Sequence, residues 1–225
     1  MKKLKWAQRQ PNNTEDCFTT SISDLMAGLL NIFILALAYY ILNFSVIREQ
    51  WENNDTIRNQ FLKEIQSSIV MVEIDEKKGT ITLPEGLLFN RGEAKFKNEE
   101  SKKLIKKLSF VFVKLLNEDK YSNRIDTIFI EGHTDNTQVK GKAYGNWELS
   151  VNRAIETWKL MNNAGTQPKI STLTNKKGEP FFSCSGYADT RPVIPDATNE
   201  KGHEANRRIS FRVTVTPPPD RETTP

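Results

Sequence analysis

The stretch Ile128–Asp135 has the sequence IFIEGHTD, an apolar run that ends directly in polar residues. Apolar residues of this kind over four to eight positions indicate a β-strand. Polar side chains that follow a strand, at the start of a loop, are well placed to form a binding site. This stretch therefore predicts a strand that leads into a candidate site.

Apolar spacing on both sides predicts alternating strands and helices. Strands are expected at 69–74, 80–83, 124–131, 181–185 and 208–215. Helices are expected at 98–117 and 149–161, and a polar loop at 163–180. The buried face of the second helix is expected to contain Val151, Ala154, Ile155, Trp158 and Met161. This order predicts an α+β fold, an α/β sandwich in which two or three helices cover one sheet.

The composition limits the possible classes of protein. The chain has 225 residues, of which 37% are apolar and 27% charged, and 12 Phe and 4 Trp can build a core, so a disordered chain is not expected. Two cysteines exclude a disulfide scaffold, and a mixed net charge of +4 gives no reason to expect nucleic-acid binding. The mean hydropathy of −0.55 describes a soluble protein, but this average conceals one apolar segment.

Residues 18–47 contain a single charge, Asp24, and residues 25–47 contain none. A helix of roughly 20 residues crosses the hydrocarbon layer, so the segment is long enough to be a transmembrane helix. It is longer than the apolar region of a signal peptide and ends in bulky residues, which favours an uncleaved anchor. Four basic residues in the first nine predict that residues 1–17 are cytoplasmic and residues 48–225 lie across the membrane. Cys17 and Cys184 would then lie on opposite sides as free thiols.

Asp24 has two interpretations. It is either an interfacial helix cap or an ion-carrying carboxylate inside the membrane. Ser21, Asp24, Gly28 and Asn31 share one helical face, while the other faces hold apolar residues. A polar stripe of this kind indicates a protein partner or a wet path rather than lipid.

The segment 48–69 has the pattern of an amphipathic helix. Ile57, Phe61, Ile65 and Ile69 recur at four-residue spacing, with Trp51 and Leu62 nearby. This linker helix could dimerise, act as a plug, or pack on the outer domain at 70–216. The tail at 217–225 has four prolines in nine residues and is predicted to be disordered.

The polar residues around the central stretch do not predict an enzyme. His133 and His203 are the only histidines, and no nucleophile–base pair, HExxH spacing or metal-ligand cluster accompanies them. Asn146 or Ser150 could cap the helix expected at 149–161. Arg153 lies in the first turn of this helix and is expected to point away from its buried face. If Asp135 and Arg153 are adjacent, they could recognise a group with both an amine and a carboxylate. The alternatives are an Asp–Arg ion pair without a ligand, and a turn capped by Thr134 and Asp135.

Four ordered motifs resemble the OmpA-like peptidoglycan-binding domain over about residues 70–215. They are Ile128–Asp135, the NWELSVNRA stretch Asn146–Ala154, Gly186-Tyr187-Ala188 with Pro192, and Asn206–Ile209. The Asn-Trp-Glu-Leu-Ser form is similar to the branch found in MotB-type stator proteins, and Ser23–Met26 before the apolar run resembles their proton-carrying segment. Two departures are noted: Ala188 replaces the second glycine of a Gly-x-Gly motif, and the loops 136–145 and 163–180 look long.

The resemblance implies roles for individual residues. Asp135 would bind the amine of diaminopimelate in peptidoglycan, and Arg153 its carboxylate. Asn146, Leu149, Arg207 and Asn90 match positions that border this pocket. Asp24 would be the ion-translocating residue. No cofactor and no metal are implied.

The resemblance also implies an assembly: a homodimer anchored to the cell wall, inside a ring of a MotA-like subunit in the bacterial inner membrane. The short spacer and total length favour the MotB-like subunit of Zorya anti-phage systems, whose ring partner is of the ZorA type. A flagellar stator for motility and a passive OmpA-like envelope tether are the alternatives. The choice between proton and sodium stays open.

Overall fold

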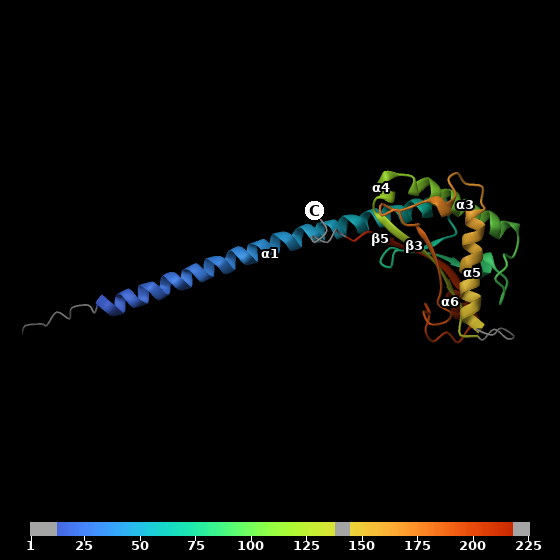
Figure 1. The fold of residues 1–225 in the computed structure, drawn as a ribbon. Coiled ribbons are helices and arrows are strands. Elements are labelled where there is room, and N and C mark those ends of the chain that lie inside the picture. Colours follow the sequence, from blue (N-terminus) through green and yellow to red (C-terminus); the bar gives the residue numbers. More distant parts are fainter. Residues whose placement is uncertain (1–12, 138–144, 218–225) are drawn as a thin grey trace, which may run out of the picture. The chain divides into compact units, whose positions relative to one another are not determined.

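The computed structural model describes residues 13–137 and 145–217, which fall into two compact units, Met1–Gln50 and Trp51–Pro225 (Figure 1). The predictions for most of residues 1–17, for the tip of the loop 136–145 and for the tail beyond Pro217 lie outside the described residues. Helix α1 (Asn13–Ser68) contributes to both units.

The first unit contains the apolar part of α1. By length and composition, one helix among the described residues could cross a membrane; its most apolar 18-residue window has a mean hydropathy of 2.2 and none of it is buried. Asp24 lies in this part, and its side chain is exposed in the single chain, as are Ser21, Gly28 and Asn31.

The second unit is a five-stranded sheet with helices, as the sequence predicts. The strands are β1 (Glu73–Asp75), β2 (Thr80–Pro84), β3 (Ile125–His133), β4 (Phe182–Gly186) and β5 (Arg208–Val215). The main helices are α3 (Glu99–Leu116) and α5 (Gly145–Asn162). Short helices that the sequence did not predict are α2 (Glu85–Leu88), α4 (Asp119–Ser122), the 3₁₀ turn η1 (Ile170–Thr172) and α6 (Glu200–Asn206).

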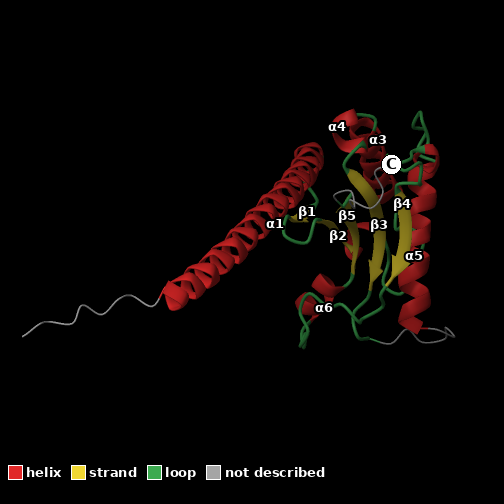
Figure 2. Ribbon diagram, turned by 60° about the vertical axis from the view of Figure 1, so that its left-hand side comes forward, coloured by secondary structure: helices red, strands yellow, loops and turns green. Residues whose placement is uncertain are grey.

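The sheet order is β1-β2-β5-β3-β4, and only β3 and β4 run parallel. Helix α5 connects these two strands and packs along them (Figure 2). A register shift lies between Ile125 and Ile128 in the β3–β5 pairing. Strict alternation along 124–131 would place Ile125 on the face opposite Ile128 and Ile130. Because of this irregularity, all three are buried in one core.

The C-terminal part of α1 belongs to the core of this unit. Phe61, Leu62 and Ile65 are completely buried, and the Phe61 ring contacts Phe112 at 5.9 Å and Tyr121 at 5.1 Å between centroids. The C-terminal part of the segment 48–69 therefore packs on the outer domain, which is one of the three alternatives that the sequence left open.

The two faces of the sheet differ in chemistry, as period-two alternation requires. Ile81, Leu83, Ile209, Phe211 and Val213 point to the helices and are buried. Their neighbours on the other face are polar or charged and line a groove: Thr80, Thr82, Arg208, Ser210 and Arg212.

Candidate functional site: a buried four-charge pocket

Two glycines allow helix α5 to approach the strands that form the site. Gly132 and Gly186 are paired across β3 and β4. A Cβ atom on Gly132 would lie 2.0 Å from the Ser150 carbonyl oxygen, and one on Gly186 would lie 2.4 Å from Val151. The close approach therefore requires glycine at both positions, and it brings the start of α5 to the end of β3.

Ala188 stands where the family motif has its second glycine. Its φ is +47°, in the left-handed region, and its side chain is buried. Its backbone N–H donates to Ser150 Oγ, and its carbonyl oxygen accepts from Thr134 N–H. Alanine at this position therefore keeps the left-handed backbone conformation. A residue other than glycine adopts this conformation at a free-energy cost of about 1 kcal/mol.

Five of the six residues expected to form the peptidoglycan site line one pocket of about 120 Å³. Its lining includes Asp135, Asn146, Leu149, Arg153 and Arg207, with Glu85, Arg91 and Thr137. Asn90 is outside the lining, but its carbonyl oxygen is 3.4 Å from Arg153 Nη2. None of the lining residues comes from the loop 163–180, which folds on itself through a bridge between Thr174 and Pro180.

Arg153 is buried, with 1% of its surface exposed, so the expectation that it points away from the buried face is wrong. The buried face of α5 is more polar than predicted, with Ser150 and Thr157 also buried, while Val151, Ile155 and Trp158 are only half-buried. The guanidinium group pairs with Glu85 and donates through Nε to the Glu93 carbonyl oxygen at 2.8 Å.

Asp135 is paired with a different arginine from the one expected. Its Oδ2 accepts from Arg207 Nη1 at 2.6 Å, and its Oδ1 accepts from Thr137 N–H at 3.0 Å. Asn146 does not cap α5; its amide donates to the Asp135 carbonyl oxygen at 3.1 Å. Burial alone would raise the pKa of Asp135, but the bonds from Arg207 and Thr137 lower it overall.

Glu85 joins the two ion pairs and was missed by sequence reasoning. It binds Arg153 through Oε1, and its Oε2 lies 3.1 Å from Arg207 Nε without satisfying hydrogen-bond geometry. Burial raises the pKa of Glu85, with Arg153 and Arg207 opposing the shift. Glu85 lies in a segment for which the sequence predicts no helix or strand, and a single acidic residue there has no local signature of burial.

The site is thus a chain of alternating charges, Arg153–Glu85–Arg207–Asp135, with two cations and two anions. Such an arrangement offers a guanidinium group to a ligand carboxylate and a carboxylate to a ligand amine. The two positive and two negative charges of this chain cancel. A ligand with one charge of each sign therefore fits the pocket better than a simple ion does.

Comparison with known proteins agrees with the fold and the motifs. Residues 88–207 match the OmpA family, and the chain therefore belongs to this family. It is similar to two proteins of Bacillus subtilis (strain 168): the uncharacterized protein YtxE, with 32% identity over 68% of this chain, and Motility protein B, with 28% identity over 72%. The chain spans 59% and 56% of the length of these relatives.

A solved structure supports the fold alone. A MotB-like protein from Desulfovibrio vulgaris is 21% identical and superposes with a TM-score of 0.54, covering 78% of this chain and 98% of its own.

Proposed function

We propose that this chain is a single-pass inner-membrane protein whose outer domain binds peptidoglycan and whose membrane helix works in an ion-driven, MotB-like stator complex. The observation that supports wall binding is the pocket that brings Asp135, Arg153 and Arg207 together with Glu85. The free end of diaminopimelate in a cell-wall peptide has an amine and a carboxylate on one carbon, and the pocket offers a partner of opposite charge to each.

In this proposal Asp135 accepts the ligand ammonium and Arg153 holds the ligand carboxylate. Both residues are already occupied, by Arg207 and Glu85. Ligand binding therefore shares or exchanges existing ion pairs, and the net charge of the pocket does not change. Asn146 fixes the backbone of Asp135, and Leu149 closes the apolar side of the pocket.

The wall-binding proposal is tested with the full chain in detergent and isolated sacculi. Free meso-diaminopimelate should release the protein from the sacculi, whereas 6-aminohexanoic acid, whose amine and carboxylate are on different carbons, should not. Asp135→Asn, which keeps the shape of the side chain, should lower the bound fraction at least tenfold. Asp119→Asn, at an exposed carboxylate outside the pocket, is the matched control. Equal release by both amino acids would refute the assigned pocket.

The ion-translocation proposal rests on Asp24 and its helical face. A carboxylate among apolar residues costs about 2.5 kcal/mol or more at the centre of a membrane unless it has a partner or a wet path. A ring of a MotA-like subunit around a homodimer of this chain would supply that partner, with residues 1–17 in the cytoplasm and the outer domain in the periplasm.

Asp24→Asn should leave membrane insertion and sacculus binding intact but abolish the biological activity of the complex. Asn31→Ala, on the same face, is a control that keeps the carboxylate. A fully active Asp24→Asn protein would exclude the ion-driven mechanism. Repeating the activity assay with sodium replaced by potassium would separate a sodium from a proton current.

The biological role within this class has two candidates. The short distance along the chain from Ile47 at the end of the apolar segment to Phe61, the first apolar side chain buried in the domain core, favours the compact subunit of a Zorya anti-phage system with a ZorA-type ring. The similarity to Motility protein B favours a motility stator. Deleting the gene in its host and scoring phage plating and swimming decides between them. Loss of swimming alone would overturn the defence role.

A further inference from the structure

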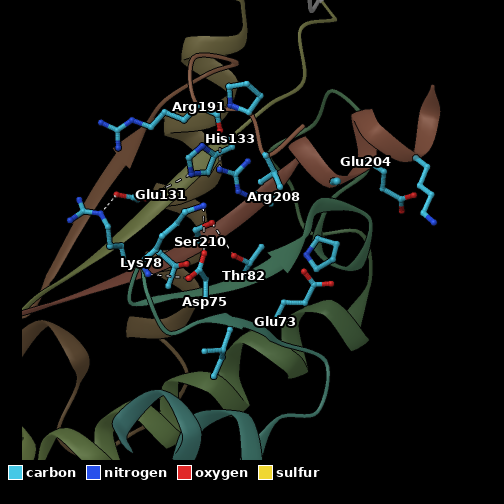
Figure 3. A pocket seen from close by; sticks show the side chains of 18 residues that line it. Glu73, Asp75, Lys78, Thr82, Glu131, His133, Arg191, Glu204, Arg208 and Ser210 are labelled. Carbon is cyan, nitrogen blue, oxygen red and sulfur yellow. Dashed lines mark hydrogen bonds and ion pairs between the residues drawn. The ribbon is translucent and has the colours of Figure 1, made fainter. Parts of the chain in front are cut away.

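A second cavity in the described part of the chain is larger than the four-charge pocket. It is a groove of about 790 Å³ on the polar face of the sheet, where residues of helix α6 also line it (Figure 3). The two cavities share no lining residue. The volume lies within the range of roughly 300–1,000 Å³ that small-molecule sites have.

At three strand ends, neighbouring residues point into different cavities. Pro84 lines the groove and Glu85 the pocket; His133 lines the groove and Asp135 the pocket; Arg208 lines the groove and Arg207 the pocket. The motifs therefore supply a second set of side chains that the proposed function does not use.

His133 forms the floor of the groove. It is 2% exposed, and neither ring nitrogen has a hydrogen-bond partner in the structure. Its Nε2 is 3.8 Å from Glu131 Oε2, but Glu131 is already bonded to Arg212 at 2.8 Å. Buried polar groups are ordinarily hydrogen-bonded, so a buried ring that faces a groove without a partner points to a ligand.

Two guanidinium groups flank this ring. Arg208 donates to the carbonyl oxygens of Asn206 and Arg191, and no ion pair is recorded for it among the described residues. The Arg191 guanidinium stacks 3.6 Å above the Tyr187 ring, which in turn stacks on His133 at 5.5 Å between centroids. Figure 3 shows Arg191, His133 and Arg208 grouped at one end of the groove.

We propose that His133, Arg208 and Arg191 form a second binding site, which holds the carboxylate of a peptide-sized ligand on the polar face of the sheet. The charged residues along the groove comprise five cations and four anions, among them Glu131 and Glu204. This excess of one positive charge favours an anion, and the planar guanidinium groups beside the ring match the two oxygens of a carboxylate.

The site is coupled to protonation of His133. Burial lowers the pKa of its ring; Glu131 on β3 opposes this, while Arg208 on β5 and Arg191 in the loop after β4 reinforce it. Burial also lowers the pKa of Arg208 to about 10, so this residue stays charged at neutral pH. A bound carboxylate favours the imidazolium form, so the ring takes up a proton on binding and affinity rises as the pH falls.

The test uses the full chain in detergent, with isotope-labelled histidine observed by NMR. The chain has only two histidines, and a His133→Gln sample assigns their signals. Acetate should shift the His133 signal and raise its pKa, with at least fivefold tighter binding at pH 5.5 than at pH 7.5. The His203 signal should move less.

Arg191→Gln should abolish the acetate response, and because this side chain is exposed, the variant should fold normally. Arg208→Gln should do the same. Lys78→Gln, which removes a groove cation that is paired with Asp75, should keep the response. An unshifted His133 signal, or an equal response in Arg191→Gln, would overturn the site. Tighter binding of inorganic phosphate than of acetate would overturn the assignment to a carboxylate.

Discussion

At the scale of single residues, Glu85 is the feature that most changes the interpretation of the pocket. It is 3% exposed and neutralises the arginine that the family motif assigns to the ligand. A buried charge is tolerated only when it is paired, so Glu85 and Arg153 depend on each other. Arg153 is therefore both a proposed ligand residue and a structural one.

Glu85→Gln should destabilise the outer fragment 51–217 by about 3 kcal/mol, because it leaves the buried Arg153 charge without its carboxylate. Urea unfolding measures the change. Glu156→Gln is the control, since Glu156 pairs with Lys159 on the surface and should change stability by no more than about 0.5 kcal/mol. A similar effect of both variants would contradict the dependence of Arg153 on Glu85.

Asp135 predicts a pH dependence of stability. Its pKa is lowered in the folded state from an ordinary value of 3.8, so the unfolded chain takes up the proton first as the pH falls. The stabilisation is present above pH 3.8 and is lost as the pH falls towards the lowered value. Unfolding measured from pH 6 to pH 2.5 should show a smaller loss in Asp135→Asn than in the wild type. Parallel curves would refute this contribution.

At the scale of elements, the surprise is that α1 provides core residues to the outer domain. Phe61 lies between the rings of Phe112 on α3 and Tyr121 on α4. Four-residue spacing predicts an apolar helix face, but it does not identify the surface that this face covers. The sequence therefore left open whether this face packs on the domain or serves as a dimerising or plug helix.

Phe61→Ala should destabilise the outer fragment by about 3–5 kcal/mol, because it opens a cavity in a fully buried cluster. Phe110→Ala on α3 is the matched control, since the Phe110 side chain is 52% exposed and should contribute less than about 1 kcal/mol. Urea unfolding compares the two variants. Equal costs would show that α1 does not belong to the core.

At the scale of the whole molecule, the second compact unit begins at Trp51 and so includes most of the segment 48–69. A fragment 51–217 should therefore unfold cooperatively on heating, whereas a fragment 70–217 lacks Phe61, Leu62 and Ile65 and should be largely unfolded at 37 °C. Circular dichroism measures both. A stable 70–217 fragment would show that the α1 residues are dispensable.

Much of the architecture follows from local patterns. The predicted strand at 208–215 agrees with β5 at both ends, and the helix at 98–117 agrees with α3 to within one residue at each end. Local spacing succeeds here because alternation and helical periodicity directly reflect which side of an element is buried. Local spacing does not describe the strand at 124–131, because the irregular pairing between Ile125 and Ile128 changes the face to which the side chains point. It also does not describe α5, because the buried face of this helix includes the charged residue Arg153.

The sequence by itself determined the strands and main helices, the apolar segment at 18–47, and the motifs that place Asp135, Asn146, Leu149, Arg153 and Arg207 at one site. Only the tertiary structure decided which charges meet. Glu85 and Arg153 are 68 positions apart, and their pairing depends on how closely α5 approaches β3 over Gly132. Likewise, only the sheet determines that Arg207 and Arg208, adjacent in the chain, serve two different cavities. Ion pairs between distant segments have no local signature, because the free energy that selects them arises from burial in the folded chain.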